Sequence, residues 1–211
     1  MAVKVVAFTK PVSEEFGNNL SEFIAYVARV SNPSNQGSHD TAQKLLDYLE
    51  KHKHWSPFEM ADIVLEIETT RDIARQMLRH RSFSFQEFSQ RYAEVSEFSE
   101  TKEARFQDKK NRQNSLKVEE EFHWVNEWWD EQQRTLLDQI ETVYRDALDQ
   151  GIAKEVARVI LPEGLTKSRL YMKGSVRSWM HYLSVRLDPS TQKEHRELAQ
   201  EISEAVNSVL K

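Results

Sequence analysis

The chain has 211 residues, of which 39% are hydrophobic and 30% are charged, and it carries a formal net charge of -5. Its length suffices for a hydrophobic core and its composition is that of a globular protein, which excludes a largely disordered chain. The net acidity disfavours a broad basic surface for nucleic acid, and the absence of cysteine excludes disulfides, thiolate metal sites and every mechanism with a cysteine nucleophile.

The N-terminal stretch MAVKVVAFTKP is too short and too interrupted for a signal peptide, and no apolar run approaches the length that spans a membrane. We therefore expect a cytoplasmic protein that has no membrane partner. The length favours a single domain over residues 1–211, and the charge favours partners other than nucleic acid.

The first predicted elements are a strand and two helices. Residues 3–8, VKVVAF, are rich in β-branched residues and favour a strand that ends before Pro11. Apolar residues recur at three- and four-residue steps in residues 18–31 and 41–52, which predicts two helices. The polar residues 32–40 between them are expected to form a loop.

A second strand and a helix follow. Residues 61–70 alternate apolar and polar side chains, so Ile63, Leu65 and Ile67 are expected on one face of a strand. From residue 71 the apolar period becomes helical, and this helix is expected to end near residue 80.

The middle of the chain is predicted to be an extended segment, an exposed connection and a long helix. The alternation in residues 82–85 favours a short strand or extended loop, and the charged residues 96–121 favour an exposed connection. A long helix is expected from Phe122 to near Gly151, a plausible C-terminal cap. Its three tryptophans, expected in the core or in a contact between subunits, are Trp124, Trp128 and Trp129.

The C-terminal part is predicted to be mainly helical. Residues 153–161 favour a short helix that Pro162 stops, residues 168–174 a strand, and residues 175–187 and 190–210 two helices. The candidate N-terminal caps of the last helix are Ser190 and Thr191. The sequence therefore predicts an α+β fold in which helices dominate. With five glycines and no glycine-rich phosphate loop, side chains would have to hold any nucleotide.

The segment QMLRHRSFSFQEFSQRYAEV, residues 76–95, concentrates groups suited to a phosphorylated sugar. Guanidinium groups bind phosphate in a fork, and a carboxylate or an amide can bind ribose hydroxyls. The competing interpretation is a solvated basic helix end, which is common. His80 lies between two arginines, so its neutral form is favoured. The candidate ligands of this segment are Gln76, Arg79, Glu87, Ser89 and Arg91.

Arg158, Arg177 and Arg186 lie within apolar helical segments. A buried guanidinium needs an anion or several acceptors, because an unpaired charge in the interior costs several kcal/mol. Both a ligand anion and an internal salt bridge to a glutamate remain open. His52 and His54 have no third ligand of a suitable type nearby, so no metal site is expected.

Arg79-His80-Arg81, followed after seven residues by Ser89, resembles the signature of the flavin-dependent thymidylate synthases. Other segments resemble the family's conserved blocks in the family's order, and together they cover most of the chain. These segments are ARVS at 28–31, HWSPFE at 54–59, ARQMLRHR at 74–81, EVARVILP at 155–162, SVRSWMHYLSVR at 175–186 and TQKEHRE at 191–197.

The resemblance implies the reductive methylation of dUMP to dTMP, with methylenetetrahydrofolate as the one-carbon donor and NADPH as the reductant of a bound FAD. It implies a reaction without an enzymic cysteine nucleophile, which agrees with a chain that has no cysteine. It also implies a central, mainly antiparallel sheet flanked by helices, in a homotetramer whose active sites are built from several subunits.

The resemblance also assigns roles to residues. Arg186 would be catalytic, since it would lie against the uracil where negative charge develops. The residues assigned to dUMP are Gln76, Arg79, Glu87, Ser89, Arg91, Arg158 and Arg186. The residues assigned to FAD are Ser56, Arg79, His80, Arg81, Ser175, Arg177 and His181, with His54 and Glu59 on the flavin and folate side.

Three positions depart from the family pattern: Gln86 replaces asparagine, Met60 replaces a histidine of many members, and Ser175 replaces an asparagine of some members. The first two keep open a diverged flavoprotein of the same fold. A further alternative is a nucleotide- or single-stranded nucleic-acid-binding module that stacks bases on phenylalanines. Those phenylalanines would be Phe83, Phe85 and Phe88.

Overall fold

The computed structural model describes residues 2–210, which form a four-stranded sheet with helices on one face and at both ends. The strands lie in the order β1 (Ala2–Phe8), β2 (Asp62–Thr70), β6 (Lys167–Ser175) and β3 (Ser84–Glu87). Each neighbouring pair is antiparallel. The predicted α+β class with a central antiparallel sheet is confirmed.

The period-two pattern of the central strands decides which face of the sheet is buried. Ile63, Leu65 and Ile67 of β2 are fully buried, as predicted, and Leu170 and Met172 of β6 extend the same apolar surface. Residues between them point to the opposite face, which is polar and more exposed. The sheet therefore has one face that must be covered.

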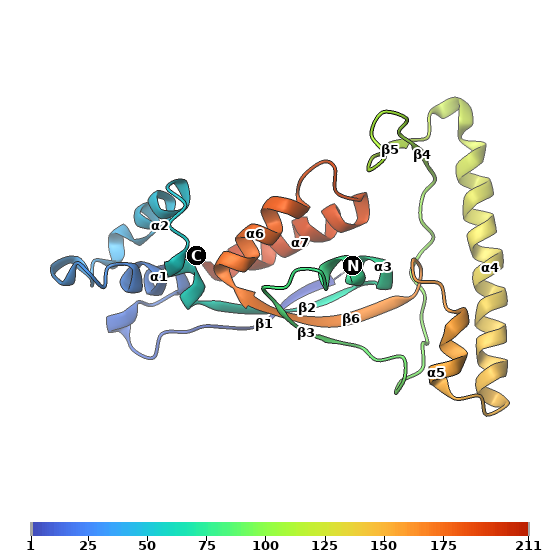
Figure 1. The fold of residues 1–211 in the computed structure, drawn as a ribbon, viewed down its shortest axis with the longest axis horizontal. Coiled ribbons are helices and arrows are strands. Elements are labelled where there is room, and N and C mark those ends of the chain that lie inside the picture. Colours follow the sequence, from blue (N-terminus) through green and yellow to red (C-terminus); the bar gives the residue numbers. More distant parts are fainter. Residues whose placement is uncertain (1, 211) are drawn as a thin grey trace.

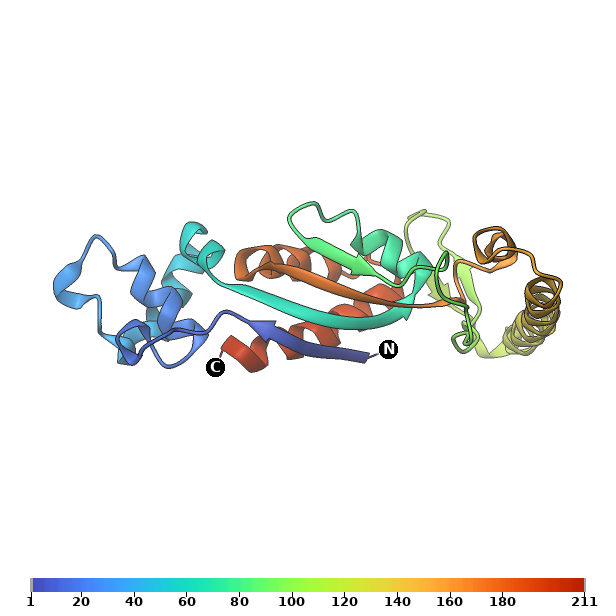
Figure 2. The ribbon, with the colours of Figure 1, turned by 90° about the horizontal axis from the view of Figure 1, so that it is seen from below.

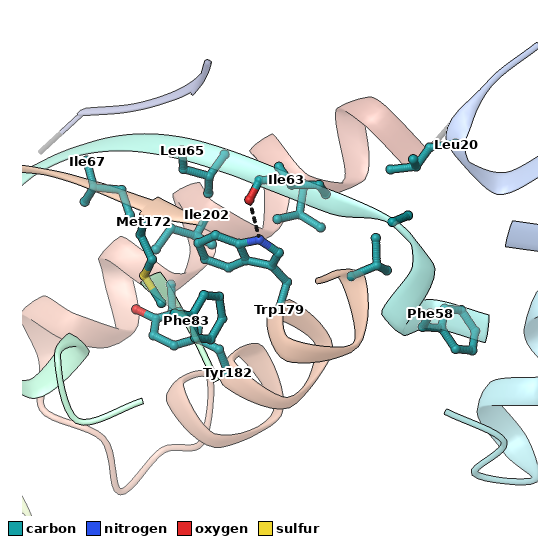
Figure 3. Close-up of a cluster of buried hydrophobic side chains, with 14 of the residues drawn as sticks. Leu20, Phe58, Ile63, Leu65, Ile67, Phe83, Met172, Trp179, Tyr182 and Ile202 are labelled. Carbon is teal, nitrogen blue, oxygen red and sulfur yellow. Dashed lines mark hydrogen bonds between the residues drawn. The ribbon is translucent and has the colours of Figure 1, made fainter. Parts of the chain in front are cut away.

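Helices α6 (Val176–Arg186) and α7 (Lys193–Leu210) cover that face. Trp179 of α6 is fully buried, and its indole N–H donates to the Ile63 carbonyl oxygen at 3.2 Å (Figure 3). This bond satisfies the one polar atom of a large apolar side chain. The position of α6 on the sheet is thus fixed by both packing and hydrogen bonding.

Further helices lie beyond the two ends of the sheet (Figure 1). At one end, α1 (Leu20–Ala28) packs against α2 (Ala42–Lys51). At the other end, α4 (Trp124–Asp149) packs against α5 (Lys154–Ala157), and Figure 2 shows α4 nearly end-on, far from α1. Short 3-10 helices are Glu14–Phe16, Pro33–Asn35, His39–Thr41, Ser56–Met60, Glu120–Phe122 and Arg158–Ile160. None of the described helices is both long and apolar enough to cross a bilayer.

The long helix α4 ends as the sequence predicts but does not bury its tryptophans. Gly151 adopts φ +81° just after the helix, and its N–H donates to the Leu148 carbonyl. Within the helix only Gln133 and Tyr144 are buried. The core interpretation of the tryptophans is wrong for this chain, because α4 does not pack on the sheet, while a contact between subunits stays a prediction. Their exposures are 57% for Trp124, 52% for Trp128 and 38% for Trp129.

Three local features add to the sequence predictions or differ from them. The helix expected to end near residue 80 is α3 (Arg71–Met77), which ends slightly earlier because the chain turns where the His80 N–H bonds the Met77 carbonyl. The expected connection 96–121 contains a small hairpin whose strands pair with each other. The last helix begins at Lys193, because Ser190 and Thr191 bond to Asp188 in the preceding turn instead of capping it. The hairpin strands are β4 (Arg105–Gln107) and β5 (Ser115–Lys117).

Gly174 of β6 supplies a test of this packing. A Cβ at this position would overlap the ring of Phe83 and lie 2.5 Å from its Cε1 atom. Phe83 in turn packs against Trp179 with ring centroids 4.7 Å apart, so the ring has little room to retreat. We predict that Gly174→Ala lowers the free energy of unfolding by about 1–3 kcal/mol in urea denaturation.

The matched control is Gly164→Ala, where a Cβ would have no atom within 4 Å and φ is not in the left-handed region. We expect it to be neutral or slightly stabilising. Equal unfolding free energies for the two variants would contradict the packing described around Phe83.

Candidate functional site

Arg186, the last residue of α6, is held by neutral acceptors. Its Nε donates to Nε2 of His80 at 3.0 Å, and its Nη2 donates to the backbone oxygen of Gln76 at 3.3 Å. No ion pair among residues 2–210 includes it. Burial, as the largest cause, lowers the pKa of Arg186 from its ordinary value, but the group stays charged. A half-buried cation without a carboxylate is suited to an anionic ligand.

His80 is neutral in this environment, as predicted. Burial lowers its pKa to about 4, and the positive charges of Arg186 and His181 contribute in the same direction. Because its Nε2 accepts from Arg186, the proton of the neutral ring must be on Nδ1. The ring also meets Tyr182 edge-on at 4.9 Å between centroids, which fixes its orientation.

Two exposed arginines extend the positive charge around Arg186. Arg79 and Arg81 are exposed, and within the described part of the chain neither of them has a carboxylate oxygen within 4.0 Å. The charge of Arg79 contributes to the lowered pKa of Arg186, so the two lie close together. We call Arg79, Arg81 and Arg186 the cationic cluster. The structure thus brings together the predicted residues Gln76, Arg79, His80, His181 and Arg186.

A second group of predicted residues lies at the start of α6. Ser175 caps the helix, since its Oγ accepts from the Ser178 N–H, and the same Oγ donates to Glu59 Oε2 at 2.5 Å. Arg177 Nε lies 3.6 Å from Glu59 Oε1, and Ser56 begins the 3-10 helix that carries Glu59. An 11-residue helix spans about 16 Å, so this group and Arg186 lie at opposite ends of α6.

A third group lies toward the α4 end of the sheet. Glu87 Oε1 accepts from Ser168 Oγ at 2.8 Å and lies 3.4 Å from Nη1 of Arg71. Arg91 Nε lies 3.3 Å from Glu155 Oε2, and Arg158 Nε donates to the Glu155 carbonyl.

Ser89, also predicted to bind substrate, belongs to this third group because its Oγ accepts from the Arg91 N–H. Among the described residues, no hydrogen bond or ion pair joins the third group directly to Arg79 or Arg186. In one chain these predicted substrate ligands therefore have no direct polar contact with Arg79 or Arg186.

Two cavities lie beside residues of the third group and their neighbours. A cavity of about 590 Å³ is lined by Arg91, Tyr92 and Glu155, and another of about 920 Å³ by Phe88, Lys102 and Ser168 among others. Arg79 and Arg186 line neither of them. Within the cationic cluster, Arg79 and Arg81 are exposed and Arg186 is half-buried.

The three residues that depart from the family pattern lie at exposed or helix-capping positions. Met60 is 59% exposed at the end of its 3-10 helix, and Gln86 is exposed on the edge strand β3. Ser175 acts as a helix cap, a role that asparagine also fills well. None of the three alters the cationic cluster.

His195 is a functional candidate that the sequence reasoning missed, although it belongs to the segment TQKEHRE. It is fully buried, with Nδ1 3.0 Å from Gln76 Oε1 and Nε2 2.8 Å from the Tyr182 hydroxyl. Burial lowers its pKa to about 3, with smaller contributions from Arg186 and His80. A lone histidine in a helical pattern gives no sign of its partner, because Gln76 lies 119 positions away.

Comparison with known proteins agrees with the resemblance. The family described as "Thymidylate synthase complementing protein" matches residues 15–210. A protein of Paramecium bursaria Chlorella virus 1, named "Probable flavin-dependent thymidylate synthase", is 52% identical over 199 residues, covering 94% of this chain and 90% of the relative. The "Flavin-dependent thymidylate synthase" of Synechocystis sp. is 53% identical over 201 residues, covering 94% and 91%.

A solved structure shares the fold. The UMP/dUMP methylase PolB from Streptomyces cacaoi, bound with 5-Br UMP, is similar with a TM-score of 0.80 and 26% identity over 99% of this chain and 89% of that one. The chain belongs to the flavin-dependent thymidylate synthase family and is an enzyme of that family.

The contact between Arg186 and His80 gives a prediction for the pKa of His80. We expect Arg186→Gln to raise this pKa above about 4, because a positive charge is removed. The pKa should stay below 6.5, because burial is the larger cause. An NMR pH titration of histidine-labelled protein measures it. Arg177→Gln, at the other end of α6, should leave the pKa of His80 in place, and a His80 pKa that Arg186→Gln does not move would contradict the contact.

Proposed function

We propose that the protein methylates dUMP reductively to dTMP, with methylenetetrahydrofolate as the one-carbon donor and NADPH as the source of reducing equivalents. The observation that carries the proposal is the half-buried Arg186, which has two neutral acceptors and no carboxylate partner among residues 2–210. The names of the two similar relatives and the nucleotide bound to the similar methylase support it.

The role proposed for Arg186 follows from its charge and its surroundings. The uracil ring gains negative charge when carbon 5 reacts, and a preorganised cation in a partly dry site stabilises that charge without having to reorganise. Neutral His80 holds the guanidinium without cancelling its charge. An ionised carboxylate in that place would neutralise Arg186 and weaken its attraction for the substrate.

The rest of the dUMP site is proposed from the third group as well as from the cationic cluster. Guanidinium groups of Arg79, Arg91 and Arg158 suit the phosphate, while Glu87 and Ser89 suit hydroxyl groups of the sugar. Arg91 and Glu155 are both half-exposed, so their ion pair costs little to exchange for a phosphate.

FAD fits the residues along α6 by chemistry and by extent. Arg79 and Arg81 are exposed cations without carboxylate partners in the described chain, which suits a diphosphate. Ser56, Ser175 and Arg177 lie at the far end of the helix, so the predicted contacts extend along about 16 Å, a length suited to a dinucleotide. His80 and His181 complete the predicted contacts. When bound, FAD would supply the hydride for the reaction.

The absence of cysteine supports a reaction without an enzymic covalent nucleophile. Ser89 Oγ accepts a hydrogen bond from the Arg91 N–H, and among residues 2–210 no general base is hydrogen-bonded to it. We therefore assign Ser89 to binding.

We also propose that the enzyme is a homotetramer whose sites combine residues of different chains. Support comes from the lack, among the described residues, of a direct hydrogen bond or ion pair between the third group and Arg79 or Arg186, and from the exposed apolar side chains of α4 and α5. Val156 of α5 is 56% exposed, and Trp124 of α4 is 57% exposed. The single-domain organisation and the cytoplasmic location stay predictions from the sequence.

The test is tritium release from dUMP labelled at carbon 5, with methylenetetrahydrofolate, NADPH and FAD. We predict that release requires FAD and falls at least about 100-fold in Arg186→Ala, since a group that stabilises developing charge is lost. Lys44→Ala, an exposed cation on α2, is the control and should keep wild-type release. Release without FAD, or full release by Arg186→Ala, would contradict the proposal.

A further inference from the structure

A continuous series of hydrogen bonds leads from Gln76 to the ion pair between Glu194 of α7 and Arg105 of β4. Gln76 Nε2 lies 2.8 Å from Gln192 Oε1, and Gln192 Nε2 lies 3.0 Å from Glu194 Oε2. Glu194 Oε1 is 2.6 Å from Nη2 of Arg105, and both of these side chains are largely buried. In the other direction the series continues from Gln76 to His195 and Tyr182.

The donor and the acceptor of every hydrogen bond in this series follow from the state of one group, the Glu194 carboxylate. Burial raises the pKa of Glu194, but hydrogen bonds from its own backbone, Gln192 and Arg105 outweigh burial, so its pKa lies below the ordinary value. An ionised carboxylate can only accept. The Gln192 atom beside Glu194 must therefore be the amide nitrogen, which leaves the Gln192 oxygen beside Gln76.

The same argument assigns the donors and acceptors at the buried end of this series of hydrogen bonds. An amide oxygen of Gln192 can only accept, so Gln76 must turn its nitrogen toward Gln192 and its oxygen toward His195. Neutral His195 then carries its proton on Nδ1 and accepts from Tyr182 at Nε2. Burial raises the pKa of Tyr182, so its hydroxyl stays protonated and able to donate.

We propose that Glu194 is a positioning residue that acts through Gln192 to hold the Gln76 amide in one orientation, with a free N–H directed to the nucleotide. This inference rests on the proposed function, in which Gln76 contacts dUMP. Without Glu194 the amide could flip and offer an oxygen in place of the N–H. Gln76 therefore selects a hydrogen-bond acceptor on the ligand.

Arg105 extends this role to the small hairpin. It lies on β4, a strand that the sequence did not predict, and it pairs with Glu194 at 2.6 Å. The hairpin thus stabilises the ionised form of Glu194, which is the form that sets the direction of the series.

The first test is the tautomer of His195, read from nitrogen-15 shifts of histidine-labelled protein. In the wild type we expect the proton on Nδ1. In Glu194→Gln the amide oxygen must still accept from Arg105, so the amide nitrogen donates to Gln192 and the hydrogen bonds reverse, and we expect the His195 proton on Nε2. The matched control Glu197→Gln changes the same charge on the same helix, at an exposed site, and should keep the proton on Nδ1.

The second test is dUMP binding by isothermal titration calorimetry. We expect Glu194→Gln to weaken binding about ten-fold, which is the value of roughly one hydrogen bond. Gln192→Met should weaken dUMP binding to a similar extent. Because this variant keeps the Arg105–Glu194 ion pair, the weaker binding cannot be attributed to the loss of that pair. Glu197→Gln should bind as the wild type does.

The outcomes separate this inference from the proposed function. A wild type that does not bind dUMP would refute the proposed function, whatever the tautomer of His195. A wild type that binds dUMP but carries the His195 proton on Nε2 would overturn the inference alone. So would a Glu194→Gln variant with an unchanged tautomer and unchanged dUMP affinity.

Discussion

The site depends on one electrostatic constraint: Arg186 is held in a partly dry environment without a counter-charge. Its partners, the His80 ring and the Gln76 carbonyl, are neutral acceptors. Because its pKa is lowered to about 4, His80 stays uncharged at neutral pH and does not repel Arg186. The fold thus keeps a partly buried cation at a cost in stability, where other proteins would neutralise the cation with a carboxylate.

The sheet and its helices make this arrangement possible. Trp179 anchors α6 to β2, which sets the position of the helix end that carries Arg186. Tyr182, one turn before Arg186, contacts both His80 and His195. It also belongs to the hydrophobic cluster around Phe83 and Trp179 (Figure 3). Core packing and site geometry are therefore two results of the same contacts.

The sequence predicted what depends on local periodicity and on motifs. Strand β2, helix α6 and the Gly151 cap follow from apolar spacing and backbone preference, and the arginines of the signature were identified by type and order. The hairpin was missed because residues 96–121 are charged and short strands give little signal. His195 was missed because its role comes from a partner far away in sequence. The exposed tryptophans of α4 show why an apolar period alone does not identify a core: it marks a face to be covered, not the partner that covers it.

We propose that dUMP binds between the cationic cluster of one chain and the third group, which contains Arg91, of another chain. The most direct measurement mixes two variants, Arg186→Ala and Arg91→Ala, lets their subunits exchange, and measures dTMP formation. If sites combine two chains, the mixture should regain roughly a quarter of wild-type activity, because that share of sites draws both arginines from intact copies. A mixture as inactive as its two components would contradict a site shared between chains.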